Sequence, residues 1–142
     1  AGLFGNSEDM LSFIKNNILE KINPDQANIV NELKDDYFKE IVKYIDTNFY
    51  KDISLQNIAR EFNINISYIC QLFNRKMHTT FTEYLRKLRI SYACSILRET
   101  DLSIGEVSTR AGFNDYFYFC RVFKKYTQTT PSIYRSTPDQ IQ

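Results

Sequence analysis

The sequence predicts an all-α fold in which two helix-turn-helix units are joined by a long connecting helix and preceded by an N-terminal helical segment. Apolar residues recur at intervals of three and four along most of the chain, as in amphipathic helices, and strand-like alternation is almost absent. Two stretches about fifty residues apart are imperfect copies of each other. In each copy two short helical patterns flank a tight corner. The corner of the second copy is one residue longer than that of the first.

A helical segment is predicted at the start of the chain. Residues 8–22 carry one apolar stripe, and Asn23 then caps a second helix that has Pro24 at its first position. This second helix either runs on to Phe49 or breaks near Asp35.

The first helix-turn-helix is expected at about residues 54–76. Ser54 caps a short helix whose apolar residues follow the spacing i, i+3, i+4 and i+7 as far as Phe62. Asn63 tolerates the left-handed backbone that such a corner usually needs. The small side chain of Ala59 lets the two helices of the unit cross closely.

The connecting helix is expected at about residues 80–99. Its start carries the capping-box pattern from Thr80 to Glu83, and an apolar stripe follows for about twenty residues. At about 1.5 Å per residue this helix spans about 30 Å. Major-groove openings on one face of B-DNA lie about 34 to 36 Å apart. A helix of this length with one helix-turn-helix unit at each end could therefore place the two units in successive major grooves, because a DNA duplex presents a similar site at every turn.

The second helix-turn-helix is expected at about residues 103–126. Ser103 and Glu106 form another capping box, and Gly112 stands where the first unit has its corner asparagine. Asn114 or Asp115 caps the next helix. A final short helix opens at Thr130-Pro131.

These elements predict three parts of the chain. The first is a helical linker, a coiled-coil seam or the remnant of an upstream sensor or receiver domain, and the second is a domain that contains both repeats. The third is a short tail. Their predicted ranges are 1–35, 36–136 and 137–142. Because the chain begins at Ala1 rather than Met, we expect it to belong to a longer protein.

The net charge of +1 conceals an uneven distribution. Residues 1–51 hold six Lys against nine acidic residues, a balance of −3, and residues 52–135 hold twelve Lys or Arg against seven acidic residues, a balance of +5. The repeats are therefore the basic part of the chain. This charge suits a polyanionic partner.

Several classes of protein are disfavoured. The three cysteines are widely spaced and odd in number, and the chain has a single histidine, so we expect no disulfide framework, no metal site and a cytoplasmic location. The sequence contains no run of eighteen apolar residues, so no membrane span is predicted. No nucleophile–base pair or glycine-rich phosphate loop is evident, so we predict neither an enzyme nor a cofactor.

The order of motifs resembles the DNA-binding domain of the AraC/XylS family of bacterial transcription regulators. The resemblance covers roughly Tyr37 to Arg135 and is most specific in its second half, from Gly112 through Lys125 and then from Thr130 to Arg135. It implies seven helices, two helix-turn-helix units and binding to promoter DNA. It also implies activation as the usual outcome, RNA polymerase as a further partner and control by a second domain.

The resemblance and the helix phase together predict the residues that read DNA. If Ile69, Leu72 and Phe73 face the core of the first unit, the opposite face of that helix is free for the major groove. The predicted base-reading residues of the two units are Ser67, Cys70, Gln71, Asn74, Tyr116, Phe117, Cys120 and Arg121. The predicted phosphate contacts are Arg75, Lys76, Arg89, Lys124 and Lys125.

Side-chain chemistry suggests which bases are read. Arg121 suits bidentate pairing with guanine and Gln71 suits adenine, whereas Phe117 or a cysteine can pack on a thymine methyl. For Tyr116 and Phe117 the alternative is packing against the rest of the second unit.

The sequence departs from the family at four positions. Gln71 and Asn74 stand where the family usually has Arg and Lys, so the first unit is expected to read a different base or to bind more weakly. His78 and Gln128 stand where the family usually has Gly, so both turns are expected to adopt another conformation.

The alternative function is a helical protein-interaction module, sigma-like or an adaptor, whose binding would be insensitive to salt.

Overall fold

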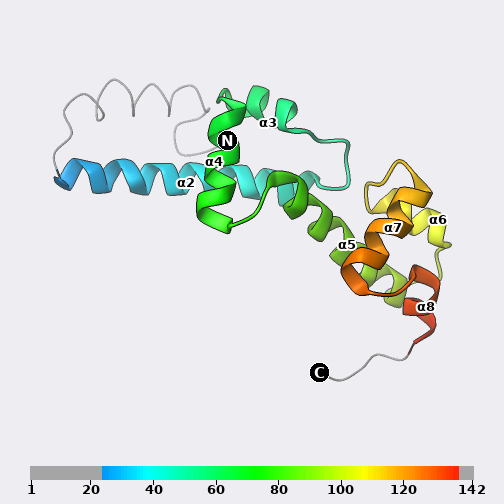
Figure 1. The fold of residues 1–142 in the computed structure, drawn as a ribbon. Helices are drawn as coiled ribbons and strands as arrows, with labels where there is room; N and C mark the ends of the chain where they lie inside the picture. The colour runs from blue at the N-terminus through cyan, green and yellow to red at the C-terminus, as the bar shows by residue number, and fades with distance from the viewer. Residues whose placement is uncertain (1–23, 138–142) are drawn as a thin grey trace. The chain divides into compact units, whose positions relative to one another are not determined.

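The computed structural model describes residues 24–137, and every regular element in that range is a helix (Figure 1). The predicted stripe at residues 8–22 and the end of the tail lie outside these described residues. In chain order the helices are α2 (Pro24–Asn48), α3 (Leu55–Phe62), α4 (Ile66–Met77), α5 (Phe81–Glu99), α6 (Ile104–Arg110), α7 (Tyr116–Thr127) and α8 (Pro131–Ser136). None of these helices is long and apolar enough to cross a membrane.

The described chain divides into two compact units. The first contains residues 24–47 and Ile53–Phe81, and the second contains Asn48–Asp52 and residues 82–137. The connecting helix α5 thus belongs almost entirely to the second unit, and so does the short loop that follows α2.

In the first unit, α2 is one uninterrupted helix of 25 residues, so the alternative of a break near Asp35 was wrong. Ile41 and Ile45, four residues apart, are fully buried. The ring of Phe38 meets that of Phe73 on α4 edge to face, with centroids 5.2 Å apart. The apolar face of α2 therefore supplies a large part of this unit's core.

Local signals in the sequence explain α3 and its corner. The Ser54 hydroxyl accepts a hydrogen bond from the backbone N–H of Asn57, which confirms the predicted cap. Asn63 adopts the predicted left-handed conformation, with φ 52°. Its backbone N–H donates to the carbonyl of Ala59 and ends the helix.

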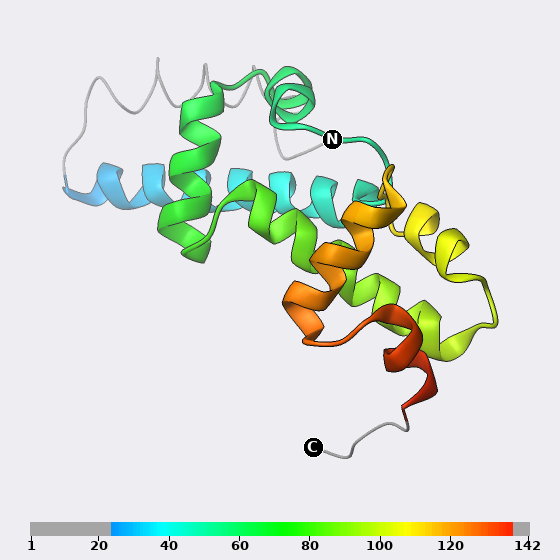
Figure 2. The ribbon, with the colours of Figure 1, turned by 45° about the vertical axis from the view of Figure 1, so that its right-hand side comes forward.

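The second unit is built on α5, whose 19 residues match the predicted connecting helix. Figures 1 and 2 show α7 crossing α5, with α8 following at the end of α7. The core of this unit is formed by α5, α6 and α7. Its residues that are at most 1% exposed include Ala93, Leu97, Val107, Phe119 and Phe123.

The caps of the second unit follow the sequence. Ser103 begins α6 and accepts a hydrogen bond from the backbone N–H of Glu106. Asp115, one of two predicted candidates, caps α7. Gly112 has φ +97°, and a Cβ added there would lie 2.9 Å from the carbonyl oxygen of Phe49. Only glycine fits this corner without displacing the loop at 48–52.

Candidate nucleic-acid interface

The second helices of the two helix-turn-helix units, α4 and α7, are built alike. Each has 12 residues, and they begin at residues 66 and 116. Asn65 and Asp115 cap their N-termini through side-chain oxygens. Both helices end at a residue in the left-handed conformation. The duplication read in the sequence is therefore a duplication of local structure, and residues fifty apart are equivalent.

The inward faces of both helices are core, as the helix phase predicts. On α4, Ile69, Leu72 and Phe73 are 0 to 1% exposed. On α7 the equivalent positions, Phe119, Val122 and Phe123, are buried as well. This burial fixes the rotation of each helix and leaves the opposite face outward.

The outward faces carry the predicted base-reading residues. On α4 all four are exposed, namely Ser67, Cys70, Gln71 and Asn74. On α7, Tyr116, Phe117 and Arg121 are exposed and Cys120 is half-buried. Each predicted set thus lies together on one accessible helix face. Packing of Phe117 into its own unit, the alternative, does not occur, because its side chain is 73% exposed.

The face of α7 combines cationic and aromatic groups. Phe117, Arg121 and Lys124 follow the spacing i, i+4 and i+7, so they form one exposed stripe. The Arg121 guanidinium carbon lies 5.6 Å from the ring centroid of Tyr118. A cation over an aromatic face at this distance is attracted by the ring, so Tyr118 restrains the arginine.

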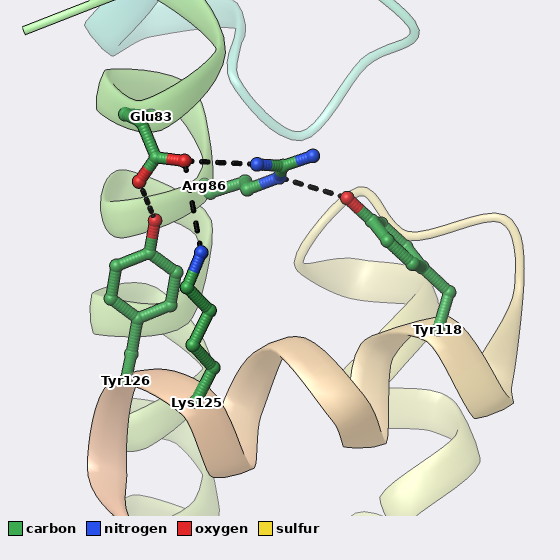
Figure 3. A network of polar contacts seen from close by, with 5 residues as sticks. All are labelled: Glu83, Arg86, Tyr118, Lys125 and Tyr126. Atoms are coloured by element: carbon green, nitrogen blue, oxygen red, sulfur yellow. Dashed lines mark hydrogen bonds and ion pairs between the residues drawn. The ribbon is translucent and has the colours of Figure 1, made fainter.

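A polar network holds Tyr118 in place (Figure 3). The Arg86 Nε donates to the Tyr118 hydroxyl at 2.8 Å, and the Arg86 Nη1 donates to Glu83 Oε1 at 3.0 Å. Glu83 also accepts a hydrogen bond from the Tyr126 hydroxyl. The network therefore ties the first turns of α5 to both ends of α7.

This network shifts the pKa values of its members. The hydrogen bond from Tyr126 is the largest effect that lowers the pKa of Glu83, and the nearby cations Lys125 and Arg86 lower it further. Burial, followed by the hydrogen bond to Glu83, raises the pKa of Tyr126 to about 12. At neutral pH the carboxylate is therefore charged and the phenol is a donor.

The predicted phosphate contacts differ in their availability. Arg75 and Lys124 are exposed. Lys125 is also largely exposed, with its Nζ 4.0 Å from Glu83 Oε1. The ammonium of Lys76 forms an ion pair with Asp35 on α2, so part of its charge is neutralised within the chain.

Arg89 has a structural role that we did not predict. Its Nε donates to the carbonyl of Phe49 at 2.7 Å and its Nη2 donates to that of Lys51 at 2.9 Å. Burial lowers the pKa of this guanidinium, and its carbon lies 5.9 Å from the ring centroid of Phe113. These hydrogen bonds make Arg89 an anchor that holds the loop at 48–52 against α5, and its contact with a phosphate stays a prediction.

The turns after α4 and α7 also correct an expectation. Without glycine, His78 and Gln128 were expected to adopt another conformation, but they have φ 54° and 66°. Their backbone N–H groups donate to the carbonyls of Asn74 and Lys124 and close each helix. The left-handed cap is thus preserved with residues that tolerate it poorly.

Three contributors to the site were missed from the sequence. Asn65 stands directly before α4, and its capping role could have been read from the preference for asparagine at such positions. Tyr118 and Arg86, which support Arg121, are 32 residues apart and have no local signal that links them.

Comparisons with known proteins agree with this geometry. A family model described as a helix-turn-helix domain matches residues 58–137. The uncharacterized HTH-type transcriptional regulator YijO of Escherichia coli K12 is 37% identical over 98 residues, which are 69% of this chain and 35% of that protein. The chain spans about a third to a half of the length of the first curated relatives that it matches.

Solved structures show the same fold. The C-terminal domain of AraT, a response regulator from Geobacillus stearothermophilus, is 28% identical with a TM-score of 0.67, over 69% of this chain and 82% of that one. The DNA-binding domain of AdpA, a global transcriptional factor solved with a target DNA, is 19% identical with a TM-score of 0.67, over 70% of this chain and 89% of that one.

Proposed function

Because this chain belongs to the AraC-type family of helix-turn-helix proteins, we propose that it is a transcription regulator that binds specific DNA sequences through α4 and α7. The observation that carries the proposal is the pair of equivalent helices, each with a buried apolar face and an exposed polar face. A helix of this kind fits the major groove, where its exposed residues reach the base edges.

The two units read successive major grooves in this proposal. The repetition of similar helices supports it, because a duplex presents a major-groove opening about every 34 Å along one face. The two half-sites differ in sequence because the two helix faces differ. The domain that binds them corresponds to residues 36–136.

Arg121 is assigned to guanine and Gln71 to adenine. A guanidinium can donate two parallel hydrogen bonds to guanine O6 and N7, and a carboxamide can pair with adenine N6 and N7. The restraint of Arg121 by Tyr118 supports this role, because less side-chain entropy is lost on binding. The two reading surfaces are completed by the exposed residues Ser67, Cys70, Asn74 and Tyr116 and by the half-buried Cys120.

The cations Arg75, Lys124 and Lys125 are assigned to phosphates. They lie in the last turns of α4 and α7 and are exposed. Contacts of this kind fix the register of the protein on the duplex without reading its sequence. Lys76 contributes less, because Asp35 already pairs with it.

The partial match to longer relatives supports a proposal for the wider context of the protein. We assign residues 1–35 to a linker or to the end of an upstream sensor or receiver domain, and we place the protein in the cytoplasm, where promoters and RNA polymerase are. Activation of transcription, rather than an enzymatic reaction, is the proposed output. The names of matched relatives support it, since one is a lactose operon transcription activator of Staphylococcus xylosus.

Selection of bound duplexes from a random pool, at two salt concentrations, tests the proposal. The expected result is enrichment of two unlike half-sites about one helical turn apart. Affinity should fall steeply with salt, because each neutralised phosphate releases counterions. A protein-interaction module would instead give no enriched sequence and salt-insensitive binding to its partner.

Two substitutions then separate base reading from phosphate contact. Arg121→Ala should cost roughly 1 to 3 kcal/mol at one guanine and relax selection there, whereas Lys125→Ala should weaken all duplexes about equally. Equal losses of both variants on selected and random duplexes would contradict the base-reading assignment.

A further inference from the structure

We infer that Phe117 reads the 5-methyl group of a thymine close to the guanine read by Arg121. The second unit then selects both a guanine and a nearby thymine. This inference rests on the proposed function, because it assigns a ligand to one residue of the same helix face. The side chain of Phe117 is 73% exposed, more than any other large apolar side chain among the described residues. Full exposure of a phenyl ring in water is unfavourable, and a ligand that covers the ring recovers that free energy.

The position of Phe117 points to DNA as the group that covers it. Arg121 lies one turn further along the exposed face of α7, and Lys124 follows on the same stripe. A protein partner for an exposed aromatic would favour an apolar surround, yet the charges here are cationic. A polyanion that also presents an apolar group matches this stripe.

The major groove presents such an apolar group. Among the four bases, thymine alone carries a methyl on its major-groove edge, and apolar side chains distinguish thymine by contact with it. Four helical residues rise about 6 Å, so Phe117 and Arg121 reach bases about two steps apart or closer.

The neighbouring side chains hold Phe117 in a defined place. Its ring meets that of Tyr116 edge to face, with centroids 5.5 Å apart and planes at 79°. Interaction with the Cys120 thiol raises the pKa of the Tyr116 hydroxyl. Tyr116 thus flanks the ring of Phe117 on the same exposed face, and Phe117 presents its uncovered face outward.

The first unit provides an internal comparison. Ser67 is the residue of α4 that is equivalent to Phe117, and it is exposed but polar. Its hydroxyl can donate to or accept from several bases and has no preference for a methyl. The contact that Phe117 makes therefore has no counterpart at the equivalent position of the first unit.

Replacement of thymine by uracil tests the inference, because it removes the methyl and keeps the base pair. Starting from the selected duplex, each thymine is replaced in turn and the Kd of the whole chain is measured. At one position, one or two base pairs from the guanine that depends on Arg121, uracil should weaken binding about fourfold. In Phe117→Ser, which copies the first unit, thymine and uracil should bind equally at that position.

Ile133→Ser is the matched control, because Ile133 is another exposed apolar residue of the second unit but lies on α8. It should leave the uracil effect unchanged. Uracil effects below twofold at all thymines, a fourfold effect that persists in Phe117→Ser, or a selected half-site without thymine within two base pairs of the guanine would each overturn the inference. These outcomes differ from failure of the proposed function, in which no sequence is enriched and Arg121→Ala has no base-specific effect.

Discussion

At the scale of single residues, the most unusual backbone positions are those that end the two recognition helices, α4 and α7. His78 and Gln128 both have positive φ, and so does Asn63 at the first corner. For a residue with a side chain this conformation costs roughly 1 to 2 kcal/mol, and asparagine and glycine bear it most easily. The two caps therefore store strain in a surface turn that glycine would relieve.

Substitution by glycine should stabilise the protein. We expect His78→Gly to raise the free energy of unfolding by roughly 0.5 to 1 kcal/mol, because the released strain exceeds the extra entropy that glycine gives the unfolded chain. Gln128→Gly should gain less, since it also removes the hydrogen bond from Gln128 Nε2 to the carbonyl of Lys125. Urea denaturation monitored by circular dichroism measures both effects.

The control for these variants is Asp101→Gly, which places glycine at an exposed loop position without positive φ. It should be slightly destabilising. Loss of stability in His78→Gly, comparable with that of the control, would show that the left-handed cap is not strained.

At the scale of elements, the link between α5 and α7 depends on Glu83. The sequence indicates a capping role for this residue, because it stands three positions after Thr80. In the structure its carboxylate accepts hydrogen bonds from Tyr126 and Arg86 and lies near Lys125. A residue of the first turn of α5 thus secures the last turn of α7.

The pKa shift of Glu83 predicts a dependence of stability on acid. Because its folded pKa is lower than its unfolded value of about 4.5, the carboxylate stabilises the fold above about pH 4.5, and this stabilisation is lost as the pH falls through the folded pKa. Glu83→Gln should therefore cost roughly 1 kcal/mol at pH 7 and much less near pH 3. Thermal unfolding across this pH range measures the difference.

Glu99→Gln serves as the control on the same helix, since Glu99 is exposed in the last turn of α5. It should cost nothing at pH 7. A constant difference between wild type and Glu83→Gln from pH 7 to pH 3 would contradict the assigned role of the carboxylate.

At the scale of the whole molecule, the helices α4 and α7 of the two units are alike in length and caps and unequal in charge. The exposed face of α4 carries Gln71 and Asn74, where α7 carries Arg121 and Lys124. Of the two cations at the end of α4, Lys76 is already paired with Asp35. The second unit should therefore supply more of the affinity for a polyanion, and the first unit should chiefly adjust specificity.

Transfer of a charge between equivalent positions tests this asymmetry. Asn74→Lys should strengthen binding to all duplexes and steepen the fall of log K with log salt by about 0.9, the value for one added phosphate contact. The reciprocal Lys124→Asn should make the fall shallower by a similar amount, and Lys124→Arg should leave it unchanged. Salt titrations of binding measure the slopes, and an unchanged slope in Asn74→Lys would place this face away from the duplex backbone.

The sequence by itself determined the helices, most of their N-terminal caps and the rotation of α4 and α7. These features depend on neighbouring residues, such as Ser54 before α3 and the apolar spacing of Ile69, Leu72 and Phe73. Side chains three or four positions apart share a helix face whatever the rest of the fold does. The exposed and buried faces could therefore be read from the chain alone.

Only the tertiary structure determined which polar groups of residues far apart in the sequence interact with each other. It showed that Arg89 anchors the loop at 48–52, paired Lys76 with Asp35 and placed Tyr118 between Arg86 and Arg121. An isolated arginine or lysine has the same local pattern whether it binds DNA or a carbonyl oxygen of its own chain. Its partner is set by which segments pack together, and that depends on long-range burial that helix periodicity does not encode.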